Sequence, residues 1–114
     1  MLVRGSQSRK ISNSPNCIFW EYPLETGNLS VGRALINGRY PENGRVTNHV
    51  CEETYAVVSG SGVIYSEYCG VFPIEEGDVY LFKPGERYVV YGHNLLIDVV
   101  NVPAWYPEQH EIID

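Results

Sequence analysis

Short runs of β-branched and aromatic residues alternate with turn residues along the chain from Cys17 onward. Pairs such as Asn37-Gly38 and Asn43-Gly44, and the triplet Gly60-Ser61-Gly62, predict tight turns because these residues readily adopt positive φ angles. No window of three helical turns has apolar residues at helical spacing, and only residues 107–112 predict a short helical turn, beginning at a proline. Strands are predicted at residues 18–22, 29–36, 45–50, 54–59, 62–65, 71–73, 78–82, 87–91 and 95–102. Short strands at this spacing are typical of an all-β sandwich or barrel.

The length and composition fit one β domain. With 114 residues the chain is long enough for one domain with a real core and too short for two. Its aromatic residues, nine Tyr, three Phe and two Trp, favour strands over helices. Residues 1–16 are polar and predict a flexible leader that precedes a single barrel domain at residues 17–114. In an alternative interpretation, residues 1–16 pair with a neighbouring subunit.

Charge and cysteine content limit the expected partners and the expected cellular compartment. A formal net charge of −6 repels phosphate backbones and anionic lipid surfaces, so neither nucleic acid nor a membrane is expected as a partner. The three cysteines form no C-x-x-C pair, which suits a reducing compartment better than a disulfide framework. Residues 1–16 contain no apolar run that would act as a secretory signal. We therefore expect a cytoplasmic protein.

The strand predicted at residues 45–50 leads into a group of potential metal ligands. If this strand continued unbroken, alternation would put His49, Cys51 and Glu53 on one face. An imidazole, a thiolate and a carboxylate together are a recognisable ligand set. In the alternative the chain turns at Glu52, and Cys51 packs as a small buried hydrophobic residue. The sequence favours the second interpretation for Cys51 and leaves both open for His49.

Two segments resemble the motifs of the cupin superfamily. Residues 55–62, Tyr-Ala-Val-Val-Ser-Gly-Ser-Gly, are similar to the strand and turn of the first cupin motif. Gly77-Asp78-Val79 followed by Pro84-Gly85 is similar to the start of the second motif. The resemblance covers residues 29–102, most of the chain. It implies an antiparallel jelly-roll β-barrel that holds a metal ion or a small ligand and that forms a homodimer.

The resemblance also implies where metal ligands would lie. The first motif of the family reads His-x-His followed by Glu; counting back from Glu53 puts its histidines on His49 and Thr47. The last histidine of the second motif falls on Tyr88. Since only His49 and Glu53 match, we expect a degraded site and no cofactor. The alternative is a divalent metal ion on His49 and Glu53, with Cys51 or Tyr88 as a further ligand.

Three functions follow from these features. The first is a metal-free barrel that binds a sugar-like, nucleoside or aromatic metabolite, because tyrosines offer apolar rings with hydroxyl tips. The second is a metal-dependent isomerase or dioxygenase built on His49 and Glu53. The third is a dimeric protein-interaction module that uses the leader and Trp105-Tyr106. The predicted ligand-binding residues are His49, Glu53, Tyr55, Tyr80 and Tyr88, with Arg33, Arg45 or Arg87 to orient an anionic group, whereas His93 and His110 are expected at the surface.

Overall fold

The computed structural model describes residues 1–68 and 70–114, so Cys69 lies outside the described residues. Almost all of its regular structure is antiparallel β-strand, which confirms the all-β prediction. The strands are β1 (Arg9–Ser14), β2 (Cys17–Glu21), β3 (Ser30–Tyr40), β4 (Arg45–Asn48), β5 (Glu52–Ser66), β6 (Gly70–Glu75), β7 (Val79–Phe82), β8 (Tyr88–Val102) and β9 (His110–Ile113). Two short 3-10 turns accompany them, η1 (Gly5–Gln7) and η2 (Pro107–Gln109).

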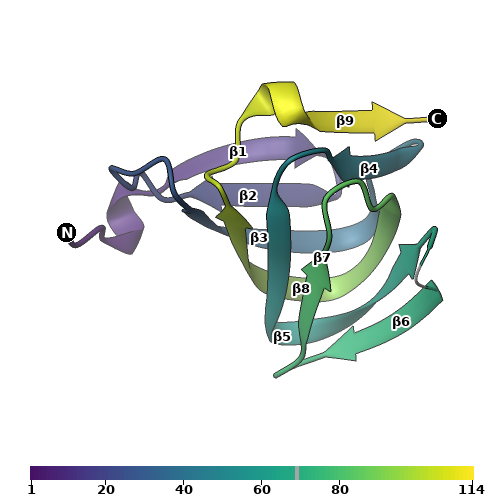
Figure 1. Cartoon of the computed structure of the whole chain (residues 1–114). Coiled ribbons are helices and arrows are strands. Elements are labelled where there is room, and N and C mark those ends of the chain that lie inside the picture. Colours follow the sequence, from purple (N-terminus) through teal and green to yellow (C-terminus); the bar gives the residue numbers. More distant parts are fainter. Residues whose placement is uncertain (69) are drawn as a thin grey trace.

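The strands form a sheet that curls into a jelly-roll barrel (Figure 1). The long strand β8 lies between β3 and β5 along most of its length, and β1 and β2 extend the β3 side. The far edge of β5 pairs with β7 near its start and with β6 near its end. At the other end of the barrel, β9 pairs with β4, and β4 meets β8. This curvature gives the sheet an interior face.

The strands β3 and β5 are longer than predicted, because Gly38 and Gly60, expected in turns, lie inside them. The strand β8 joins the two strands predicted at residues 87–91 and 95–102. The pairing of β3 with β8 shifts register next to Gly38, and the pairing of β5 with β8 shifts on both sides of Ser59. Gly60 has a φ of +78° and packs against the Asn94 carbonyl, where a Cβ would come within 1.9 Å of that oxygen. A glycine inside a strand allows such a bulge and the bend that closes a barrel.

Both ends of the chain also differ from expectation. Residues 9–14 of the expected leader form β1, which pairs with β2 from Arg9↔Glu21 to Ser14↔Cys17. Their polar composition suits an edge strand whose side chains are mostly exposed. At the other end, the expected helical turn spans only Pro107–Gln109, and the chain continues as β9 because its backbone pairs with β4. Tertiary pairing decides both segments.

The core lies on the interior face of the barrel. Alternate residues of β5 are buried, among them Glu53, Tyr55 and Val57, as the period of a half-buried strand requires. Phe82 of β7 stacks on Tyr88 of β8 with ring centroids 4.0 Å apart. The core therefore continues directly into the group of polar side chains described next.

Candidate functional site

Glu53 is a buried carboxyl group in the barrel interior. It belongs to β5, where it shares the inward face with Tyr55, and only 7% of it is exposed. Alternation along a strand puts both residues on one face, and both are buried there. In the register of the sheet, Glu53 lies directly opposite Asn101 of β8. The neighbouring position of β7 is Phe82.

Three side chains donate hydrogen bonds to the Glu53 carboxyl. The Tyr88 hydroxyl donates to Oε1 at 3.0 Å, and Asn48 Nδ2 donates to Oε2 at 3.3 Å. The side-chain amide of Asn101 forms the third hydrogen bond. The Tyr55 hydroxyl in turn bonds to Tyr88. A buried carboxyl with this number of partners is held in one position.

Burial controls the protonation of this group. Loss of water raises the pKa of Glu53 from 4.5 to about 7, although its hydrogen bonds to Tyr88, Asn101 and Asn48 act in the opposite direction. Glu53 is therefore present in both its neutral and its ionised forms near neutral pH. Burial also raises the pKa values of Tyr55 and Tyr88 well above their usual range, so both hydroxyls keep their protons. The site can thus donate and accept protons at a carboxyl and donate hydrogen bonds from tyrosines.

A cavity of about 620 Å³ connects this polar cluster to the surface. Glu53, Tyr88 and Asn101 line its buried end, and all three are less than a tenth exposed. Its walls carry apolar and aromatic groups, including Phe19 and Ile36. A volume of this size matches a small metabolite.

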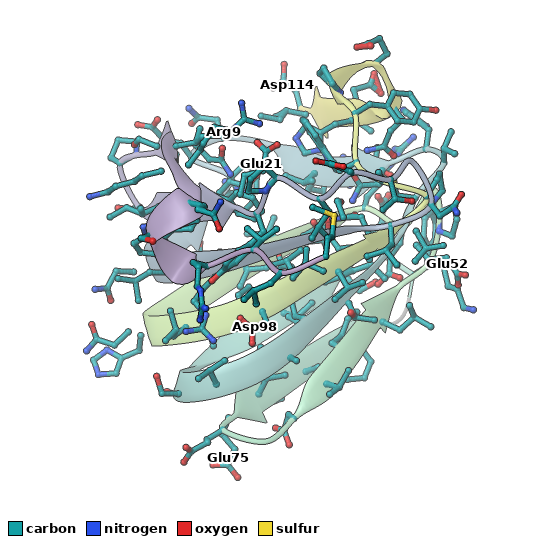
Figure 2. The ribbon with its side chains drawn as sticks, turned by 90° about the vertical axis from the view of Figure 1, so that its left-hand side faces the viewer. Arg9, Glu21, Glu52, Glu75, Asp98 and Asp114 are labelled. Atoms are coloured by element: carbon teal, nitrogen blue, oxygen red, sulfur yellow. The ribbon has the colours of Figure 1, made fainter. Side chains whose placement is uncertain are left out.

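The mouth of the cavity is formed by segments far apart in the sequence. Ile11 of β1, Glu42 of the β3–β4 loop, and Trp105 and Ile112 of the C-terminal segment line the cavity and are exposed. Glu21 lines it as well and forms an ion pair with Arg9, whose Nη2 lies 2.8 Å from Glu21 Oε1 (Figure 2). β9 and β1 both lie at this end of the barrel (Figure 1).

The cavity lining carries acidic groups and no lysine or arginine among the described residues. The arginines expected to orient an anion lie elsewhere. Arg33 pairs with Asp98 at 2.7 Å, and Arg45 pairs with Glu67 at 2.9 Å. Arg87 also faces Glu67, at 3.9 Å. The interior therefore disfavours a phosphate or carboxylate ligand.

The C-terminal segment is tied to the polar cluster through Asn48. Asn48 Oδ1 accepts a hydrogen bond from Gln109 Nε2 at 2.9 Å, and His110 Nδ1 lies 3.3 Å from the same oxygen. Because this oxygen is an acceptor, His110 Nδ1 carries the proton and its Nε2 keeps a free lone pair. His110 lines the cavity rather than lying at the surface, and burial lowers its pKa. The sequence contains no local signal for this position, because it depends on the pairing of β9 with β4.

The structure brings together some of the predicted site residues and separates others. Glu53, Tyr55 and Tyr88 all line the cavity. Tyr80 packs beside Phe72 and Phe82 in the core, and its hydroxyl donates to Glu86 at 2.6 Å. His49 is exposed, with Nε2 3.2 Å from Glu111 Oε1, and it does not line the cavity.

The position of His49 has a simple structural cause. β4 ends at Asn48, and Thr47 and Asn48 are both buried, so strict alternation stops before β5 begins. Asn48 rather than His49 consequently reaches Glu53. Cys51 is buried; its backbone amide donates to Gln109 Oε1 and its thiol to the Pro103 carbonyl. Cys51 thus packs as a small buried residue, which is the interpretation that the sequence favours.

The residues around Glu53 do not fit a metal centre. Its hydrogen-bonding neighbours are two carboxamides and a tyrosine whose proton is retained, and none of these is a strong ligand for a transition metal. Across residues 1–68 and 70–114, no group of three His, Cys, Asp or Glu side chains lies close enough to hold a metal ion. The metal set carried over from the cupin motif is therefore not assembled.

Asn101 and Asn48 are the site residues that sequence reasoning missed. Asn101 follows Leu95, Ile97 and Val99 on the inward face of β8, so strand alternation would have placed it in the interior. Asn48 gives no such signal, because it lies where the alternation of β4 breaks down.

Solved structures share this fold. PAC13 of Streptomyces, determined as a His-to-Gln variant with uridine, superimposes with a TM-score of 0.87 at 19% identity, over 99% of this chain and 90% of that one. Another structure presents Pac13 as a nucleoside dehydratase, with a TM-score of 0.86 at 20% identity over 100% and 93% of the two chains. KdgF from Halomonas gives a TM-score of 0.72 at 12% identity, over 90% and 94%. These likenesses establish the double-stranded β-helix fold of the cupins. No family model and no curated protein matches the sequence.

Proposed function

We propose that the protein binds an uncharged small metabolite, of the nucleoside or sugar-derivative class, inside the barrel. The observation that carries this proposal is the cavity with hydrogen-bonding groups of Glu53, Tyr88 and Asn101 at its buried end and apolar walls toward its mouth. Binding sites for small molecules commonly combine such walls with a few well-placed polar groups. A ligand that has both a ring and hydroxyl groups would satisfy both parts of the cavity.

The charges of the lining favour a nucleoside over a nucleotide. Glu21, Glu42 and Glu53 line the cavity, and no described lining residue is a lysine or an arginine. A phosphate group would lose its hydration and meet carboxylates instead of cations. A structural neighbour, PAC13 of Streptomyces, has been solved with uridine, which is consistent with a neutral nucleoside as the ligand class.

Calorimetric titration of uridine, adenosine and their 5′-monophosphates into the protein tests this proposal. We expect at least one nucleoside to bind and its monophosphate to bind at least tenfold more weakly, a difference of about 1.4 kcal/mol. Ala34→Leu adds bulk to a cavity wall and should abolish the binding. The control Ala56→Leu places the same bulk on the side of β5 that alternates away from the buried residues. Tighter binding of the monophosphates, or equal effects of the two variants, would refute the proposal.

A second candidate function is metal-free acid–base catalysis on the same ligand. It is favoured by the two titratable groups on one cavity, Glu53 and His110, which both hydrogen-bond to Asn48. Raised and lowered pKa values on neighbouring groups are typical of acid–base pairs. Prolonged incubation of the bound nucleoside with the protein, followed by proton NMR, tests this function. New resonances that His110→Gln abolishes would support catalysis, and an unchanged spectrum would leave binding alone.

The expected homodimer and cytoplasmic location stay predictions. Trp105 and Tyr106 are 40% and 39% exposed and offer an aromatic surface to a partner. None of the helices in the described part of the chain is long and apolar enough to cross a membrane.

A further inference from the structure

One buried polar atom at the end of the cavity lacks a partner. Asn101 is 4% exposed, and its amide group bonds to Glu53, but its Oδ1 has no hydrogen-bond partner among the described residues. A buried carbonyl oxygen without a donor is energetically costly and is therefore uncommon. Because Asn101 lines the cavity, a ligand that enters can supply the missing donor.

The neighbouring carboxyl offers a complementary contact. Tyr88 Oη, Asn48 Nδ2 and the Asn101 amide all donate to Glu53. When Glu53 is ionised, the remaining lone pairs of its oxygens can accept another hydrogen bond. When it is protonated, the two amide nitrogens cannot accept its proton, so that proton goes either to the Tyr88 oxygen or to an acceptor in the cavity. Glu53 can thus meet a ligand hydroxyl in either protonation state.

The two groups are adjacent and fixed relative to each other. Glu53 and Asn101 are directly opposite on antiparallel strands, where paired Cβ atoms lie about 4.5–5.5 Å apart. Their side chains are also joined by the hydrogen bond between them. Groups this close match two hydroxyls on neighbouring carbon atoms of one ligand.

We propose that Asn101 and Glu53 form a recognition site for a vicinal diol, such as the cis-diol of a ribose. One hydroxyl donates to Asn101 Oδ1, and the adjacent hydroxyl bonds to the Glu53 carboxyl. This inference deepens the proposed function and rests on it, since it names the part of the ligand that reaches the buried end. A deoxy ligand leaves Asn101 Oδ1 unpaired, and sites that are built to bond a hydroxyl discriminate strongly against such analogues.

Calorimetry with uridine, 2′-deoxyuridine, 3′-deoxyuridine and 2′,3′-dideoxyuridine tests the site. In the unmodified protein, we expect loss of at least one hydroxyl to weaken binding about ten- to hundredfold. Leucine has nearly the same shape as asparagine. In the Asn101→Leu variant, the affinities for uridine and for the corresponding deoxy analogue should therefore differ less than about threefold. Asn28→Leu, at an exposed loop position, is the control and should keep the full discrimination.

The outcomes separate this inference from the proposed function. Binding of uridine with equal discrimination in the Asn101→Leu variant, or without any discrimination in the unmodified protein, overturns the diol site and leaves the binding function standing. Absence of nucleoside binding in every protein overturns both. If Asn101→Leu does not fold, the side-chain amide signals of Asn101 in the unmodified protein decide. They should shift with uridine and not with 2′,3′-dideoxyuridine, and equal shifts would refute the site.

Discussion

The burial of Glu53 makes a quantitative prediction about stability. The pKa of this carboxyl rises from 4.5 to about 7 on folding, chiefly because burial removes it from water. A group whose pKa is higher in the folded protein contributes stability that is fully present below the unfolded pKa and is lost as the pH rises through the folded pKa. At about 1.4 kcal/mol for each pKa unit, the contribution of Glu53 to the free energy of unfolding should fall by ~3 kcal/mol between about pH 4.5 and about pH 8.5.

The variant Glu53→Gln removes this titration with little change in shape. Its amide meets donors from Tyr88 and Asn48, which adds a destabilising offset, but that offset does not depend on the protonation of residue 53. Urea unfolding of both proteins across this pH range measures the difference between their free energies of unfolding. We expect this difference to shift by ~3 kcal/mol in favour of Glu53→Gln as the pH rises.

A matched control separates burial from a general charge effect. Glu76→Gln makes the same substitution at an exposed turn position. Its free energy of unfolding should therefore stay within about 0.5 kcal/mol of that of the unmodified protein at every pH. A pH-independent difference for Glu53→Gln as well would refute the reasoning. It would mean that Glu53 has the same pKa in the folded and unfolded chains.

Two further predictions concern the backbone and the thiols. Gly60→Ala puts an alanine at a positive φ and brings its Cβ within 1.9 Å of the Asn94 carbonyl oxygen. Urea unfolding should therefore show that the free energy of unfolding falls by more than ~2 kcal/mol. Gly77 has a φ of +93° and open space around it, so Gly77→Ala should lower the free energy of unfolding by only ~1 kcal/mol. Equal losses in the two variants would contradict the close contact of Gly60 with the Asn94 carbonyl. In a Cys69→Ser background, the free and buried thiols of Cys17 and Cys51 should react with a thiol reagent in urea but not in the folded protein. Burial raises the pKa of Cys17 to about 11, and prompt reaction of the folded protein would contradict this burial.

Strand periodicity was sufficient to predict an all-β sandwich or barrel and the shared face of Glu53, Tyr55 and Val57 in β5. The alternation of Glu53, Tyr55 and Val57 is a local property of the chain, since successive side chains of any strand point to opposite faces. The same rule applied to β8 would have included Asn101. The resemblance of two successive segments to the cupin motifs likewise predicted the barrel, because the strands and turns of each motif are neighbours in the sequence.

Only the tertiary structure decided which polar groups meet inside the barrel. His49 faces Glu111, and Asn48 reaches Glu53, because alternation breaks between β4 and β5. His110 reaches the cavity because β9 pairs with β4, a contact across about half of the chain. Gly60 became a bulge instead of a turn because β5 continues along β8. Local sequence determines which face of a strand a side chain occupies. The partners of that side chain depend on strand pairing, which neighbouring residues alone do not specify.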